Sequence, residues 1–254
     1  MSRSEPTDLS QVPMPRACRK WLQEADVAAV IHDQWVKVNL TWWNSAIEAV
    51  GGGPVQGTVG DEMSAVGEGT ISRGDLFKIA PRAAFEPDAA LALLWHSVAW
   101  GAGPSGLRNV PRLIDSVRRN DDAASHLMRA ASLAVTSPHE AYTLLRPGQK
   151  NLFTSLGPAF FTKYLYFASA DDSHQPCLIL DRNVAVSLFH HGWTSLQADN
   201  PKKNSNWPVS TYDRYLELVT RWLDELEADT GQRPRADLIE RWLFDDGKTV
   251  TASQ

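Results

Sequence analysis

Residues Leu156-Gly157-Pro158-Ala159-Phe160-Phe161-Thr162-Lys163 form a glycine–proline turn that runs directly into an apolar segment carrying one lysine. Proline suits the first turn of a helix, where its missing N–H is not needed. Aromatic and aliphatic residues then recur at helical spacing, at positions 160, 161, 164, 165 and 168. We therefore expect a helix over residues 160–170, preceded by a turn whose N–H groups at residues 159–161 are free to bind a phosphate.

Lys163 lies at the flank of this apolar face, where its amine can serve as a nucleophile. Eighteen residues later, the apolar run Cys177-Leu178-Ile179-Leu180 leads to Asp181, which precedes another helical segment. Taken singly, Asp181 is an ordinary helix N-cap and Lys163 an ordinary solvated lysine. In this order and at this spacing, the pair favours a catalytic site.

Four segments carry a resemblance to a known family: residues 94–101, the hairpin with Lys163, residues 178–181 and residues 239–244. Together they resemble a bacterial, 8-oxoguanine glycosylase-like branch of the helix-hairpin-helix DNA glycosylase superfamily. The resemblance covers about residues 75–245. It implies an all-α fold, with two helical lobes and a cleft between them. We expect a glycosylase core at residues 75–254, preceded by an N-terminal helical segment and a glycine-rich connection at residues 1–74.

The resemblance implies an enzyme that flips a modified base out of DNA and cleaves its N-glycosidic bond, leaving an abasic site, with or without strand cleavage. Lys163 matches the catalytic lysine of the superfamily, and Asp181 its essential aspartate. Some members of the branch release glucosylated hydroxymethylcytosine from phage DNA in antiviral defence, whereas 8-oxoguanine would make the reaction a repair step. The sequence leaves this choice open. The alternative is a non-catalytic hairpin module that only binds DNA.

The expected DNA contacts are the hairpin residues Leu156, Gly157, Pro158, Ala159 and Phe160, together with the basic side chains of Arg182, Lys150 and Arg108. Ala159 or Phe160 replaces the usual second hairpin glycine, which predicts a looser phosphate contact. Residues 101–221 carry a net charge of +3, whereas the whole chain carries −5. The positive charge therefore lies in the segment that contains the hairpin.

A flipped base must be stacked between aromatic or apolar side chains. The candidates for this base pocket are Trp95, His96, Trp100, Trp42 and Trp43. Most tryptophans are core residues, so the sequence does not choose among these rings.

Other functional classes are disfavoured. The run Gly101-Ala-Gly-Pro-Ser-Gly106 has the spacing of a dinucleotide-binding fingerprint, but the segment before it has helical periodicity, so a turn between helices is the better interpretation. Two cysteines cannot ligate an iron–sulfur cluster, and no zinc motif is present. We expect no metal and no cofactor, although hairpins of this kind can bind a monovalent cation through backbone carbonyls.

No apolar run is long enough to cross a membrane, and the first residues lack the apolar region of a signal peptide. We expect a cytoplasmic protein whose partner is DNA containing a modified base, with no membrane association and no obligate protein partner. The helices are expected at residues 21–49 (with one break), from 87 onward, and at 110–119, 123–136, 139–145, 160–170, 182–191, 213–229 and 236–244. Residues 51–74 are expected to be a flexible connection, and β signals are confined to runs such as 177–180.

Overall fold

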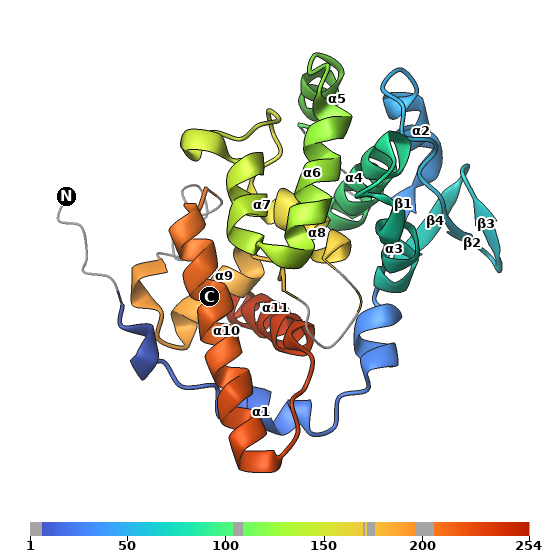
Figure 1. Ribbon diagram of the computed structural model, residues 1–254. Coiled ribbons are helices and arrows are strands. Elements are labelled where there is room, and N and C mark those ends of the chain that lie inside the picture. The colour runs from blue at the N-terminus through green and yellow to red at the C-terminus, as the bar shows by residue number, and fades with distance from the viewer. Residues whose placement is uncertain (1–6, 104–108, 170, 172–175, 197–205, 254) are drawn as a thin grey trace.

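The helical periodicity of the sequence corresponds to helices in the computed structural model, which describes residues 7–103, 109–169, 171, 176–196 and 206–253 (Figure 1). The helices are α1 (Arg16–Leu22), α2 (Leu40–Ile47), α3 (Arg73–Ile79), α4 (Pro87–Ala102), α5 (Val110–Arg118), α6 (Ala123–Thr136), α7 (Pro138–Leu145), α8 (Pro158–Ala168), α9 (Arg182–His190), α10 (Val209–Thr230) and α11 (Ala236–Ala252). The expected helical class is therefore confirmed.

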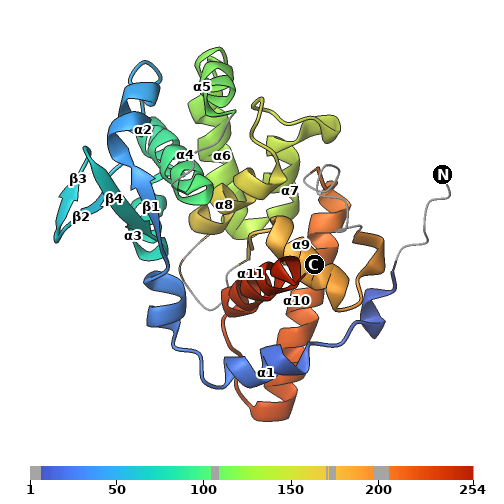
Figure 2. The ribbon, with the colours of Figure 1, turned by 180° about the vertical axis from the view of Figure 1, so that it is seen from behind.

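A small antiparallel sheet is the main departure from the sequence prediction. It consists of β1 (Trp35–Asn39), β2 (Gly57–Val59), β3 (Glu62–Ser64) and β4 (Glu68–Ser72), in the order β1-β4-β2-β3. We expected residues 35–39 to be helical and residues 51–74 to be a flexible connection, and both expectations are wrong. The glycines that suggested a loop allow close strand approach instead, since a Cβ at Gly57 would lie 2.7 Å from the carbonyl oxygen of Thr70. The sheet lies at one side of the molecule together with α2 and α3 (Figures 1 and 2).

The core is built around α4, which is buried on almost every side and packs against α6 and α8. Helix α11 packs along α9 (Figure 2). The two helices approach so closely at Gly247 that a Cβ there would lie 1.9 Å from the carbonyl oxygen of Asn183. These contacts bring the C-terminal helix next to Asp181, the residue that precedes α9.

The run Cys177–Leu180, which we expected to be a strand, is a buried segment without strand pairing. Side chains bond to its backbone in place of a neighbouring strand. The Leu178 N–H donates to the Tyr212 hydroxyl at 3.2 Å, and that hydroxyl donates to the Leu178 carbonyl at 3.0 Å. The Leu180 N–H donates to Oγ1 of Thr162 in α8 at 3.2 Å. The segment is thereby fixed against α8, and it delivers Asp181 to the neighbourhood of Lys163.

The boundary that we expected between residues 74 and 75 falls inside helix α3. The division of the chain into an N-terminal part and a glycosylase core stays a prediction. Among the described residues, no helix combines the length and apolar character that spanning a membrane requires.

Candidate active site

Lys163 lies on α8 and is buried, with 6% of its surface exposed. Its Nζ donates to Oδ2 of Asp181 at 3.1 Å and to the carbonyl oxygen of Ala159, one turn earlier, at 2.8 Å. The ring of Phe160 lies 5.5 Å from the same nitrogen. Two acceptors thus fix the amine nitrogen in one position.

The two carboxylate oxygens of Asp181 have different partners. Oδ1 accepts the N–H groups of Asn183 at 3.0 Å and Val184 at 3.2 Å, which makes the residue the N-cap of α9. Oδ2 faces Lys163. The N-cap interpretation and the catalytic interpretation of Asp181 are therefore compatible.

Gly101, near the end of α4, makes room for the lysine. A Cβ at this position would lie 2.7 Å from Cδ of Lys163, 3.1 Å from its Cε and 3.2 Å from the ring of Phe160. The glycine that suggested a nucleotide-binding fingerprint thus belongs to a helix, and it allows α4 and α8 to meet at the lysine.

A cavity of about 210 Å³ opens beside the Lys163–Asp181 pair. It lies where the sheet region, α3, α4, α8 and α11 meet. Its lining residues are Gln34, Val36, Arg73, Trp100, Gly101, Ala102, Gly103, Lys163, Ile179, Asp181, Glu240 and Phe244. The lining combines two aromatic residues, apolar side chains and four charged groups, which is a composition typical of a ligand site.

Two of the charged groups, Arg73 and Glu240, form a buried ion pair. Arg73 Nη1 lies 2.8 Å from Oε2 of Glu240, and each side chain is 1% exposed. The arginine also donates to the Tyr166 hydroxyl and to the side chain of Gln34. Burial raises the pKa of Glu240 above its ordinary value, and the nearby charge of Asp181 raises it further, whereas Arg73 opposes both effects. No local sequence pattern connects Arg73 with Glu240, because the two residues are 167 positions apart.

Of the predicted base-pocket aromatics, the structure brings only Trp100 to the lining of this cavity. Trp95 and His96 bond instead to the segment between α2 and β2. The Trp95 Nε1–H donates to the Gly51 carbonyl at 3.1 Å, and the Gln56 N–H donates to Nε2 of His96 at 2.9 Å. These two side chains connect α4 to the glycine-rich segment.

Trp42 and Trp43 also lie outside the lining of the Lys163 cavity. Trp43 is buried in the core at 1% exposure, whereas Trp42 is 42% exposed and packs edge-on against Trp43 at 5.2 Å. Trp43 is therefore a core residue, and Trp42 is a surface residue.

The hairpin turn differs from our expectation in its hydrogen bonds. The N–H groups of Phe160 and Phe161, which we expected to be free, both donate to the Gly157 carbonyl, at 2.9 and 3.0 Å. These bonds form because Gly157 is the N-cap of α8. Of the three groups at residues 159–161, only the Ala159 N–H has no partner among the described residues. Leu156 and Pro158 are buried, so their side chains anchor the turn.

The basic side chains expected at the phosphates fall into two groups. Lys150 and Arg182 are exposed, and Arg182 is the first residue of α9, directly after Asp181. Arg108 lies outside the described residues, as does the rest of the glycine run through Gly106. A monovalent cation at the hairpin stays a prediction. Among the described residues, no three histidine, cysteine or acidic side chains are grouped as metal ligands.

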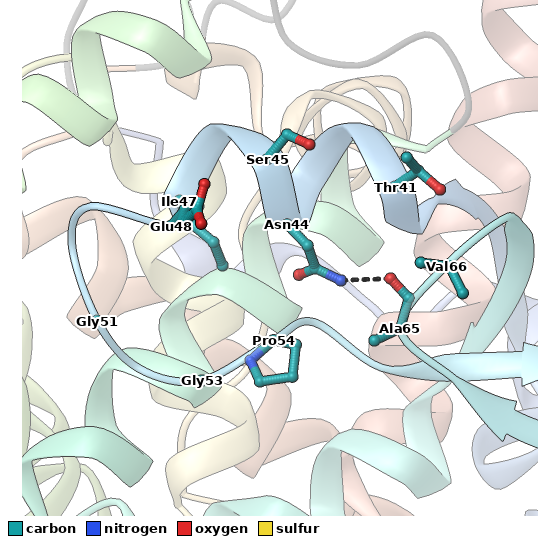
Figure 3. A pocket seen from close by; sticks show the side chains of 10 residues that line it. All are labelled: Thr41, Asn44, Ser45, Ile47, Glu48, Gly51, Gly53, Pro54, Ala65 and Val66. Carbon is teal, nitrogen blue, oxygen red and sulfur yellow. Dashed lines mark hydrogen bonds between the residues drawn. The ribbon is translucent and has the colours of Figure 1, made fainter.

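A larger hollow of about 400 Å³ lies between α2, the glycine-rich segment and the turn after β3 (Figure 3). Asn44 is its central polar side chain, and the Asn44 amide nitrogen donates to the carbonyls of Val55 and Ala65. The Asn44 carbonyl oxygen accepts the Val55 N–H at 2.7 Å. This amide connects three chain segments, and neither Lys163 nor Asp181 lines the hollow. The chemistry is therefore concentrated in the smaller cavity.

Most of the chain also matches a known protein family. Residues 29–244 match a family described as "Putative 8-oxoguanine DNA glycosylase OGG-like protein". The match begins well before residue 75, where the resemblance in the sequence became recognisable, and it includes the sheet. No curated protein and no solved structure matches the chain.

Proposed function

This chain belongs to the OGG-like family of DNA glycosylases, and on that premise we propose that Lys163 and Asp181 carry out the excision of a modified base in the cavity beside them. The observation that supports this proposal most directly is the contact of 3.1 Å between Lys163 Nζ and Asp181 Oδ2, at the wall of a base-sized cavity. A module that only binds DNA has no need of a buried amine paired with a carboxylate at such a cavity.

The proposed reaction begins when the target nucleotide swings out of the duplex into the cavity. Unstacking costs a few kcal/mol, which contacts to the base and the phosphates offset. As the bond from C1′ to the base breaks, its electron pair leaves with the base, which takes up a proton. Asp181 stabilises the positive charge that develops on the sugar.

Lys163 then supplies the nucleophile. Its Nζ, as the neutral amine, forms a bond to C1′ and loses a proton. The C1′–O4′ bond then breaks, its electron pair goes to O4′, which takes up a proton, and C1′ and Nζ are left as a protonated Schiff base. Hydrolysis of this adduct leaves an abasic site, whereas β-elimination from it cleaves the strand. If the lysine only assists the attack of water, the product is an abasic site without a covalent intermediate.

The volume of the cavity limits the size of the base that it can enclose. At about 210 Å³ it is smaller than the ~300–1,000 Å³ of sites that enclose a whole drug-sized ligand. It therefore suits a single base, such as 8-oxoguanine. In a glucosylated hydroxymethylcytosine, the glucose would extend beyond the cavity. Excision of the first base would be DNA repair, and excision of the second would be defence against phage.

The test is borohydride trapping and alkaline cleavage on two DNAs, one with 8-oxoguanine and one with glucosylated hydroxymethylcytosine. We expect base release from one of them and a covalent adduct that is lost in Lys163→Ala. Alkali-labile sites without an adduct would support a glycosylase that uses water. Binding without base release from either DNA would favour the non-catalytic module, and base release at the normal rate by Lys163→Ala would contradict the role of the lysine.

A further inference from the structure

Glu240 has a carboxylate oxygen that no described residue satisfies. Its side chain is buried, and Oε1 has no hydrogen-bond partner among the described residues. A buried, unpaired carboxylate oxygen is costly, because it loses its water and gains no donor in exchange. Glu240 also lines the cavity beside Lys163 and Asp181. A ligand in that cavity can supply the missing donor.

The other oxygen of the same carboxylate is fixed. Oε2 accepts from Arg73 at 2.8 Å, and Arg73 is positioned in turn by Gln34 and by the Tyr166 hydroxyl. The Tyr166 hydroxyl also donates to Oδ2 of Asp237 at 2.9 Å. Because this buried network sets the orientation of the carboxylate, Oε1 presents a preorganised acceptor.

We propose that Glu240 is the specificity-determining residue for the flipped base, and that its Oε1 accepts an N–H from an exocyclic amino group of that base. The proposal rests on the glycosylase function proposed above and defines its substrate class: modified bases with an exocyclic amino group, which 8-oxoguanine and glucosylated hydroxymethylcytosine both carry. Keto pyrimidines are rejected, because their ring N–H is flanked by two carbonyl oxygens that a carboxylate repels.

The test uses two matched pairs of duplexes that differ in one amino group. The first pair holds 8-oxoguanine or 8-oxohypoxanthine, and the second holds glucosylated 5-hydroxymethylcytosine or glucosylated 5-hydroxymethyluracil. The full-length protein is measured on all four for base release and for equilibrium binding. We expect the wild type to prefer the amino member of at least one pair by roughly 10- to 100-fold, as a hydrogen bond to a charged group gives.

Glu240→Gln converts the acceptor into a donor with little change in shape. Because Arg73 requires an acceptor, it binds the carbonyl oxygen of the new amide, and the NH₂ group takes the place of Oε1. We expect the preference for the amino base to fall to about one or to reverse. Asp237→Asn is the matched control, since Asp237 is buried in the same network but does not line the cavity. It should keep the preference.

Each outcome decides between the alternatives. Equal treatment of both members of both pairs by the wild type overturns the proposal without any variant. Loss of the preference in Asp237→Asn as well overturns it too, because the effect then belongs to the network. If no base is released from any duplex, the glycosylase function fails, and the binding preferences still decide the role of Glu240. Thermal unfolding confirms that both variants are folded.

Discussion

The backbone of Gly101 lies so close to the stem of Lys163 that a Cβ at residue 101 would be 2.7 Å from Cδ of the lysine. The next nearest atoms belong to the same side chain and to the ring of Phe160. The added methyl group would meet the flexible stem of the lysine at the shortest distance, so the lysine would move. The position of the proposed nucleophile thus depends on the absence of a side chain on the neighbouring helix.

We predict that Gly101→Ala lowers base release on the order of 10²-fold, because a displacement of about 1 Å at a reacting group has effects of that size. Alanine stabilises a helix interior by up to ~1 kcal/mol relative to glycine, which offsets part of the cost of displacing the buried lysine from Ala159 and Asp181. We therefore expect only a small change in thermal stability. Single-turnover rates and melting temperatures measure the two effects. Gly74→Ala, in α3, is a control because its nearest neighbour is His32 and not the lysine. A Gly101→Ala protein with wild-type rates would contradict the proposed dependence.

The N-cap role of Asp181 and its proposed catalytic role can be separated by substitution. Asparagine is as good an N-cap as aspartate, so Asp181→Asn should lose base release and destabilise the fold only by removing the buried ionic partner of Lys163. Asp181→Ala also removes the acceptor for two N–H groups and should cost about 1 kcal/mol or more. Urea denaturation and a glycosylase assay on both variants check this. Equal activity of Asp181→Asn and wild type would show that the charge is not needed.

The helical part of the fold could be predicted because its signals are local. The region 123–136 was expected as a helix and is α6, with the same bounds, and proline marks the start of α4, α7 and α8. The Lys163–Asp181 pair could be predicted because its two members are only 18 residues apart, in a segment with a recognisable order of turn, helix, apolar run and aspartate. The N-cap pattern at Asp181 was also readable, since capping depends on residues within one turn.

The sheet and the Arg73–Glu240 side of the cavity could not be predicted in this way. Residues 57 and 69 are glycines because partner strands pass close to them, and a Cβ at Gly69 would lie 2.9 Å from the Thr58 carbonyl oxygen. Glycine has low strand propensity, so the residue that permits the pairing also weakens the strand signal in the sequence. The Arg73–Glu240 pair joins α3 to α11 across most of the chain. A contact of this kind has no local pattern.

His96 should give the folded state a pH-dependent stability. Burial lowers its pKa below the ordinary value of 6.5, and the hydrogen bond to Ala92 and the charge of Asp75 only partly oppose this. As the pH falls, His96 takes up a proton in the unfolded state before it does so in the folded state. The contribution of neutral His96 to the free energy of unfolding is therefore fully present above pH 6.5, and it is lost as the pH falls from 6.5 toward the lower folded-state pKa. We predict that His96→Gln is less stable than wild type at pH 7.5 by roughly 1–3 kcal/mol.

The difference in unfolding free energy between wild type and His96→Gln should shrink from pH 7.5 to about pH 5.5, as measured by urea titration at each pH. Base preference should stay the same, because both ring nitrogens bond to the backbone, at Gln56 and at Ala92, and not to the cavity. A constant difference across this range would contradict the lowered pKa of His96. A changed base preference would support the expectation that His96 lines the base pocket.

Arg182 should contribute to DNA affinity without contributing to the chemistry. It is exposed at the first turn of α9, where its cationic side chain follows directly on the N-cap Asp181. A lost phosphate contact lowers the slope of log affinity against log salt concentration by about 0.9. We predict that Arg182→Gln shows this change in fluorescence anisotropy titrations on modified DNA, while the single-turnover rate at saturating protein stays near the wild-type value.

Arg233→Gln is the matched control for Arg182, because Arg233 lies at the connection between α10 and α11 and is paired with Asp224 and Glu227. Its removal takes the same charge from the protein, so any loss of affinity shared by both variants reflects the overall field of the molecule. A smaller salt slope in Arg182→Gln alone places a phosphate at the start of α9. Equal slopes in both variants would remove Arg182 from the DNA-binding surface and leave phosphate binding to the hairpin backbone and Lys150.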